Sequence, residues 1–283
     1  TQTGCTETVT VPNGVRTGTP PTVNFSYVPN NSCASTPVQF TDLSIATGAF
    51  VRWRWDFRDS LSSILQNPLH TYVDTGVLNV KLIVSNNGCE DSLTRQITIQ
   101  PPVAKFGYSV DCNNRLQATF LDSSLTNIIY GPITYEWRMG DPLNTIFFGA
   151  APPTFIYPSF GTYTATLIVT NGPCSYTTTR EIILVDEQVN FTISKSPVCK
   201  NEQFTLSATG GNAANIRDYS WTIGGTLISD TTRSITYQIA NYGNYDVTLE
   251  IEDINGCLTS RTITNFVQVS GVIANFVPNG PGA

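Results

Sequence analysis

Short runs of alternating apolar and polar residues fill this chain, and one of them sets its plan. In residues 53–59, Trp53, Trp55 and Phe57 occupy every second position. Successive side chains of a β-strand point to opposite faces, so these three aromatic rings share one face and the polar residues between them share the other. The pattern predicts a half-buried strand with a tryptophan at its centre.

The same strand pattern occurs three times along the chain. Its central tryptophans are separated by 82 and then 84 residues, and a phenylalanine near the start of each unit repeats at similar intervals. The tryptophans are Trp55, Trp137 and Trp221, and the phenylalanines are Phe25, Phe106, Phe191 and Phe276. Side chains as large as tryptophan favour the core, so we expect one buried tryptophan in each of three repeated modules.

Each repeat contains about seven short runs with strand alternation, separated by turns rich in Gly, Asn and Pro. Such spacing is typical of an antiparallel, immunoglobulin-like β-sandwich. We predict modules at 22–100, 102–185 and 187–270, the last strand of a truncated preceding module at 1–12, and the first strand of a truncated following module at 272–283. The linkers between modules are short, which predicts an extended, semi-rigid array.

Composition supports an all-β class and excludes several partners. Hydrophobic residues make up 40% and charged residues 13%, and no apolar run follows a helical period. The net charge is −6 and no Lys/Arg run exceeds two residues, so the basic surface that nucleic-acid binding requires is missing. No apolar stretch reaches 18 residues, which predicts no membrane span in this segment.

Seven cysteines are distributed regularly over the repeats. One lies near the start of each module and one near its end. The early cysteines are Cys33, Cys112 and Cys199, and the late ones are Cys89, Cys174 and Cys257. This regularity indicates structural disulfides and an oxidising compartment. A metal site is the weaker interpretation, because no Cys-x-x-Cys pair occurs and His70 is the only histidine.

A pairing follows if the early and late cysteines of one module lie at the same end of the sandwich, where its first and last strands run side by side. We therefore predict three bridges, each within a module. They are Cys33–Cys89, Cys112–Cys174 and Cys199–Cys257. Cys5 has the sequence context of a late cysteine, so we expect its partner to lie upstream and Cys5 to be unpaired in this segment.

The motif around Trp55 resembles that of the PKD (polycystic kidney disease) domain. The match runs through residues 55–59 and 67–72 to Gly76 and the alternating strand after it, although Arg58 and Ser60 replace two glycines of the family pattern. The resemblance is weaker around Trp137 and Trp221. PKD arrays with one cysteine pair per repeat are similar to those of very large secreted surface proteins of gliding and other Bacteroidetes bacteria.

Catalytic residues are not evident. His70 has no counterpart in the other repeats, and we interpret it as a hydrogen-bonded structural histidine beside the core. Asp56 and Asp59 are close enough to suggest paired carboxylates or a calcium site, but Asp59 is placed to cap a turn and further oxygen ligands are lacking. We therefore predict a non-enzyme with no cofactor and no metal.

The best candidate for a binding surface is a row of arginines at Arg52, Arg54 and Arg58, on the outward side of the tryptophan strand. Guanidinium groups suit an acidic polysaccharide or a carboxylate-bearing protein. A solvated sheet face on which the arginine stems cover apolar surface explains the same row.

Two functions remain open. The first is a structural stalk in a secreted cell-surface adhesin or filament, connected with gliding or adhesion, in which the partners are the neighbouring modules of the same chain. The second is an accessory array of a secreted hydrolase or protease that binds extracellular polysaccharide or other surface proteins.

Overall fold

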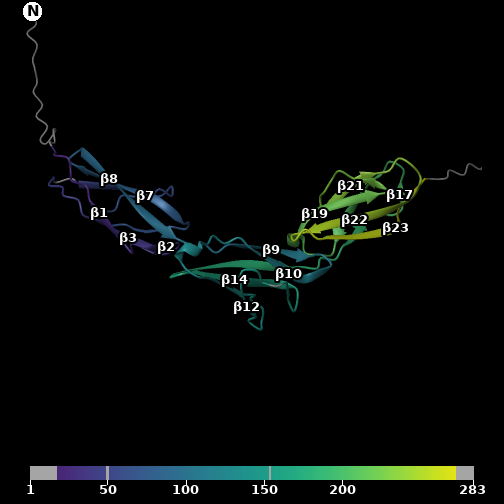
Figure 1. Cartoon of the computed structure of the whole chain (residues 1–283). Helices are drawn as coiled ribbons and strands as arrows, with labels where there is room; N and C mark the ends of the chain where they lie inside the picture. The colour runs from purple at the N-terminus through teal and green to yellow at the C-terminus, as the bar shows by residue number, and fades with distance from the viewer. Residues whose placement is uncertain (1–17, 49–50, 153, 272–283) are drawn as a thin grey trace, which may run out of the picture.

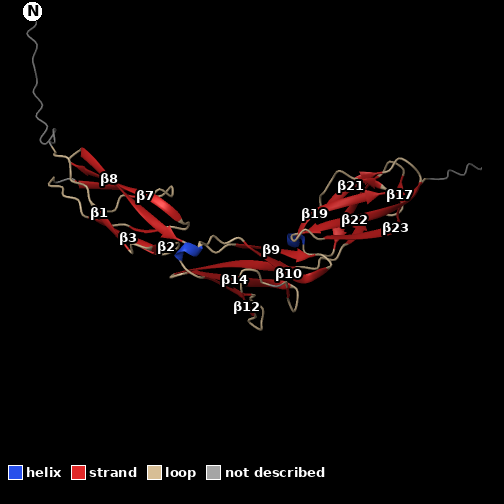
Figure 2. Cartoon of the chain, viewed as in Figure 1, coloured by secondary structure: helices blue, strands red, loops and turns tan. Residues whose placement is uncertain are grey.

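The computed structural model describes residues 18–48, 51–152 and 154–271. Strands dominate these ranges, with two single-turn 3₁₀ helices between them (Figure 2). Three β-sandwiches follow one another end to end and form a long, bent row rather than a compact body (Figure 1). The all-β, tandem-sandwich class expected from the sequence is confirmed. The expected partial modules at 1–12 and 272–283, with Cys5 and Phe276, lie outside the described residues.

The first sandwich packs a three-stranded sheet against a five-stranded sheet. The smaller sheet has the order β1 (Phe25–Val28), β3 (Pro37–Asp42) and β6 (Leu69–Thr71). The larger sheet has the order β2 (Ser32–Cys33), β8 (Cys89–Gln100), β7 (Gly76–Asn86), β4 (Val51–Asp56) and β5 (Ser62–Ser63).

The second sandwich has three and four strands in its two sheets. The smaller sheet has the order β13 (Phe155–Ile156), β10 (Asn114–Asp122) and β9 (Phe106–Asp111). The larger has the order β12 (Ile146–Phe148), β11 (Ile133–Arg138), β14 (Gly161–Asn171) and β15 (Cys174–Leu184). The 3₁₀ helix η1 (Ile128–Tyr130) precedes β11.

The third sandwich repeats the plan of the first. Its smaller sheet has the order β16 (Asn190–Ile193), β18 (Gln203–Thr209) and β21 (Ser234–Gln238). The larger has the order β17 (Val198–Cys199), β23 (Leu258–Ser270), β22 (Gly243–Asp253), β19 (Ile216–Ile223) and β20 (Thr226–Leu227). The helix η2 (Ala213–Asn215) precedes β19.

A tryptophan lies at the centre of each core. Trp55, Trp137 and Trp221 are all 0% exposed, and each indole N–H donates a hydrogen bond of 2.9–3.0 Å to a backbone carbonyl of its own module. A phenylalanine ring meets each indole edge-on, at centroid distances of 5.1, 5.3 and 5.7 Å. These rings belong to Phe25, Phe106 and Phe191, which explains why the phenylalanine repeats with the tryptophan.

The direction of the strands places the early and the late cysteine of the first module at opposite ends of its sandwich. The short strand β2 pairs in parallel with β8, and Cys33 lies opposite Gln100, the last residue of β8. Cys89 is the first residue of the same 12-residue strand. At a rise of about 3.3 Å per residue, Cys33 and Cys89 lie about 36 Å apart, at opposite ends of the first sandwich.

Candidate functional site: the junctions between modules

Two disulfides join neighbouring modules. Cys33 of the first module is bonded to Cys174 of the second, with a Cα–Cα distance of 5.5 Å. Cys112 of the second is bonded to Cys257 of the third, at 5.2 Å. Each bridge connects the early cysteine of one module with the late cysteine of the next, so the late cysteine follows the early one by 141 or 145 residues.

The predicted pairing within modules is therefore wrong. The Cα atoms of two cysteines joined by a disulfide lie about 4.4–6.8 Å apart. Cys33 and Cys89 lie about 36 Å apart along β8, so they do not form a bridge. Cys89 and Cys199, expected in bridges, are free thiols in this structure. The physical reason is that the short strand that carries the early cysteine, β2 or β17, runs in the same direction as the last strand of its module. The end of the one and the start of the other therefore lie at opposite ends of the sandwich.

Both cysteines of the second junction are presented by hairpin turns. Cys112 lies in the turn between β9 and β10, where the Asp111 carboxylate accepts a 2.9 Å hydrogen bond from the Asn113 N–H. Cys257 follows the turn after β22, where the Asp253 carboxylate accepts the Cys257 N–H at 3.0 Å. These local hydrogen bonds fix the backbone at the two positions that the bridge joins.

An arginine adds polar contacts across the second junction. Arg115, which follows Cys112 in the hairpin, donates from Nη2 to the Leu258 carbonyl at 3.0 Å and to Thr259 Oγ1 at 2.6 Å. Its Nη1 lies 3.5 Å from an oxygen of Asp253 and 3.5 Å from one of Asp186. The Arg115 and Asp253 side chains are only 12% and 1% exposed, so this ion pair is largely removed from water.

The first junction is more apolar. Tyr176, on β15 two residues after the bridged Cys174, packs against the cores of both the first and the second module. Val103, which follows the linker, packs against the first core. The Gln100 carbonyl at the end of β8 accepts the Ala34 N–H at 3.0 Å, and this bond holds the segment that carries Cys33.

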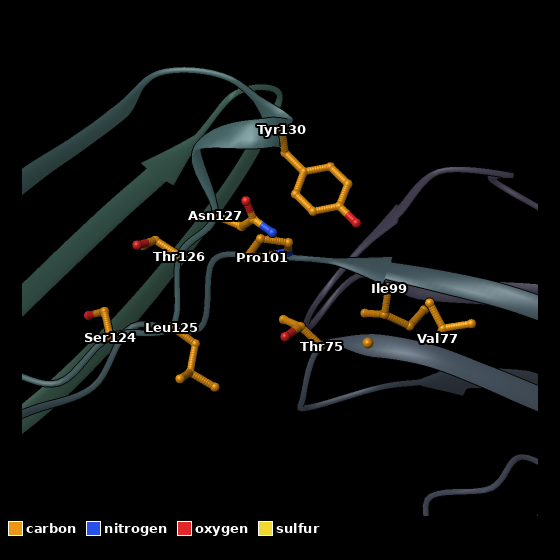
Figure 3. A pocket seen from close by; sticks show the side chains of 10 residues that line it. Thr75, Val77, Ile99, Pro101, Ser124, Leu125, Thr126, Asn127 and Tyr130 are labelled. Atoms are coloured by element: carbon orange, nitrogen blue, oxygen red, sulfur yellow. The ribbon is translucent and has the colours of Figure 1, made fainter.

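A cleft opens at each junction. At the first junction it encloses about 390 Å³, between Val77 and Ile99 of one module and Asn127 and Tyr130 of the next (Figure 3). At the second junction a cleft of about 540 Å³ lies between the ends of β14 and β15 and the segment around η2. Corresponding elements therefore line both clefts, as expected if the two junctions are repeats of one interface.

Two polar side chains that line these clefts are bonded within the protein. Asn127 accepts the Ile129 N–H at 3.0 Å and so caps η1. At the second junction the buried Glu187 carboxylate accepts from the Asn212 N–H and from Asn215 Nδ2, both at 2.6 Å. Glu187 thus holds η2 against the linker. The clefts lie between modules, and each of these hydrogen bonds lies within one module.

The other predicted residues lie away from the junctions. His70 is 9% exposed, its Nε2 lies 2.7 Å from an oxygen of Asp59, and its ring stacks on Phe57 at 3.9 Å. Asp59 also accepts the Leu61 N–H at 3.1 Å and so caps a turn. This histidine and this aspartate are bonded to each other beside the core of the first module.

Only two of the three predicted arginines lie together on the tryptophan strand. Arg52 and Arg54 are exposed on β4, but the strand ends at Asp56. Arg58 follows in a turn with a positive φ of 67°, and its Nη1 pairs with the Asp56 carboxylate at 3.3 Å. Among the described residues, Arg52 and Arg54 on β4 have no ion-pair partner, whereas Arg58 in the turn is paired with Asp56.

Within the described ranges, no three or more His, Cys, Asp or Glu side chains come together as ligands for a metal ion. No helix of the same ranges is both long and apolar enough to cross a bilayer.

The junction residues Arg115, Asp253 and Tyr176 were not predicted from the sequence. They lie near the bridged cysteines in the chain: Arg115 follows Cys112 by three positions, and Asp253 precedes Cys257 by four. Proximity to a repeated cysteine is the signal that points to them, once the cysteines are known to lie at interfaces.

Comparison with known proteins identifies the family. The sequence model of the PKD domain matches residues 18–101 and 185–269, more than half of the chain. The chain belongs to the PKD domain family. The sandwich between the two matched segments has corresponding strands and the same tryptophan–phenylalanine core.

Among curated proteins, the pre-pro-metalloprotease PrtV of Vibrio cholerae serotype O1 is 27% identical over 164 residues. The alignment covers 57% of this chain and 17% of PrtV, so it spans a small part of that protein's length.

Solved structures of tandem sandwiches are also similar. The three N-terminal domains of the outer capsid protein Hoc of bacteriophage RB49 align over 89% of this chain and 100% of theirs, with 11% identity and a TM-score of 0.36. The FN1–FN3 domains of chicken CNTN1 align over 88% of this chain and 99% of theirs, with 10% identity and a TM-score of 0.34.

Proposed function

We propose that this PKD array is an extracellular structural spacer: a disulfide-locked, semi-rigid segment of a secreted cell-surface protein, of the adhesin or filament type, that holds other parts of that protein away from the surface. The observation that carries the proposal is the placement of the bridges between modules. A bridge inside a module stabilises that module alone, whereas a bridge between modules fixes their relative position as well.

The two bridges also overlap along the chain. Cys112 lies inside the loop closed by Cys33–Cys174, and Cys174 lies inside the loop closed by Cys112–Cys257. Each of three backbone segments, 33–112, 112–174 and 174–257, therefore connects one bridge covalently with the other. One proteolytic cut in any of these segments leaves the two ends of the array covalently connected, which is valuable outside the cell.

The same bonds support an extracellular compartment. Disulfides persist in oxidising environments, including the cell surface and the extracellular medium. PKD domains are typically binding or structural modules, and a spacer role requires no catalytic group. A sandwich whose core is secured by one tryptophan can also vary its surface from repeat to repeat without loss of the fold.

Scattering in solution tests the spacer role. The oxidised chain should give a radius of gyration well above the value of about 19 Å expected for a compact domain of this length. Reduction should broaden the distance distribution, because the contacts at the junctions then hold the modules without covalent help. A radius of gyration near 19 Å in the oxidised chain would contradict the proposal.

A second candidate is an accessory array of a secreted protease or hydrolase, favoured by the similarity to part of PrtV. In that role the exposed Arg52 and Arg54 would bind acidic polysaccharide. Affinity electrophoresis in alginate gels tests it: retardation of the native chain that is lost in the Arg52→Ala/Arg54→Ala variant supports binding, with Arg138→Ala as the control. Equal mobility of all three proteins contradicts it.

A further inference from the structure

The two free thiols occupy the same structural positions as the bridged ones. Cys89 is the first residue of β8 and lies opposite Asn86 in the hairpin with β7. Cys174 is the first residue of β15 and lies opposite Asn171 in the hairpin with β14. Cys89 therefore lies at the end of the first module that corresponds to the Cys174 end of the second.

Cys199 corresponds in the same way to Cys33. Each ends a two-residue strand that pairs in parallel with the last strand of its module, Cys33 opposite Gln100 and Cys199 opposite Ser270. The turn that follows is also the same, because the carbonyl of each cysteine accepts the N–H of the third residue after it, at 3.1 and 3.0 Å. The exposed Cys199 is thus presented by the backbone geometry that carries Cys33 to its partner.

We propose that Cys89 and Cys199 are open halves of the same intermodular bridge, so that each end of this three-module unit is a docking surface for one more module of the PKD kind. The Cys199 end takes a module with a cysteine after the hairpin before its last strand. The Cys89 end takes a module with a cysteine after its first strand. This inference rests on the proposed spacer function and extends it by naming the partner at each end.

The two thiols do not bond to each other within one molecule. Cys89 lies at the end of the first module that faces away from the second, and Cys199 at the end of the third that faces away from the second, so the whole row separates them (Figure 1). Each therefore requires a cysteine outside the three described sandwiches.

Bond formation is ordinary thiol–disulfide exchange. The thiolate of one cysteine attacks a low-molecular-weight disulfide such as oxidised glutathione and releases one glutathione thiolate. The partner cysteine then attacks the mixed disulfide and releases the second. Two protein thiols are oxidised and one glutathione disulfide is reduced to two thiols, so the electrons balance.

The test adds one further module to the chain, joined through the same linker that follows the first module. Residues 1–270 are followed directly by a second copy of residues 101–185, which reproduces at Cys199 the linker seen after Gln100. Thr177→Ser in the added copy, at an exposed position, distinguishes its peptides by mass. After oxidation with glutathione and acid quenching, we expect the tryptic peptide 196–200 to be linked to the added copy of peptide 139–180.

Two controls accompany this measurement. The native Cys33–Cys174 and Cys112–Cys257 links, mapped in the same digest, show that the parent array is intact. With Cys174→Ser in the added copy, Cys199 should carry no peptide link and should be recovered as the free thiol or as its mixed disulfide with glutathione.

A reciprocal extension protects the test against failure of the added module to fold. Residues 102–185 are placed directly before residues 20–283, and here we expect Cys89 to be linked to the added Cys112. A link at either end supports the proposal. It is overturned if neither Cys89 nor Cys199 forms a link to the added module in either extended chain, or if the added Cys112 and Cys174 bond to each other. The scattering experiment on the unextended chain tests the spacer function and does not depend on the disulfide mapping. The spacer function and the docking of a further module can therefore fail independently of each other.

Discussion

Removal of one intermodular bridge should destabilise the array strongly. In the Cys33→Ser/Cys174→Ser variant, the loop of 141 residues is no longer closed. In the chain-entropy treatment of disulfides, a loop of this length contributes about 5 kcal/mol to the free energy of unfolding. If the first module unfolds while the second stays folded, the loop from Cys33 to the linker spans about 70 residues and the contribution is still about 4 kcal/mol.

Such a loss is a large share of the stability of one module, since a domain of this size has about 5–10 kcal/mol in total. For a domain below 100 residues it corresponds to a fall in melting temperature on the order of 20 °C. Calorimetry and guanidinium unfolding followed by tryptophan fluorescence measure both quantities. The matched control is Cys89→Ser/Cys199→Ser, which removes two cysteines and no bridge.

We expect the control to unfold like the native chain and the Cys33/Cys174 variant to show a separate, earlier transition of its first module. Equal transition midpoints in the two variants would refute the reasoning, because the bridge would then add nothing to the link between modules.

Two matched pairs of variants test the contacts in finer detail. Arg115→Ala should lower the free energy of unfolding by about 2–3 kcal/mol, because it leaves a buried carboxylate without its cation; the exposed pair of Arg217 makes Arg217→Ala the control, at less than about 1 kcal/mol. Tyr157→Phe loses a buried 3.0 Å hydrogen bond and should cost about 1 kcal/mol, whereas Tyr72→Phe removes a buried hydroxyl with no partner among the described residues and should be neutral or stabilising. Burial raises the pKa of both tyrosines above its ordinary value, so the unfolded chain loses these protons first and stability should fall as pH rises above about 10, less steeply in the double Phe variant. Thermal unfolding measures all three effects. Equal losses of stability within either pair of variants would contradict the first two predictions, and a pH dependence of stability that the double Phe variant does not alter would contradict the third.

The sequence predicted the sandwiches well, for a physical reason. A strand with one buried face needs apolar residues at every second position, and Trp55 shows this pattern without help from the rest of the fold. Phe25 repeats at intervals similar to those of Trp55, although its contact with the tryptophan was not predicted. Local periodicity and repetition are properties of the sequence itself.

The cysteine pairing was not predicted correctly, because it depends on the direction of strands that are distant in the sequence. Two observations already available would have been enough. Short linkers imply an extended array, and a module in such an array is entered at one end and left at the other. Its first and last strands must then run in the same direction, which places Cys33 and Cys89 at opposite ends.

The junction contacts are harder still to predict. Arg115 contacts Thr259, 144 positions away, and nothing in the local sequence of either residue indicates the other. Contacts between modules depend on the angle at which two folded bodies meet, and that angle is set by the linker, the bridge and the packing of Tyr176 together.

The pairing of the cysteines tests the central claim most directly. Non-reducing tryptic mapping of the oxidised chain, quenched in acid to prevent exchange, separates the possible links by mass. We predict that peptide 17–52 is linked to peptide 139–180, and peptide 106–115 to peptide 234–261. A link between peptides 17–52 and 82–95, or between 106–115 and 139–180, would place the bridges inside the modules and contradict the interlocked array.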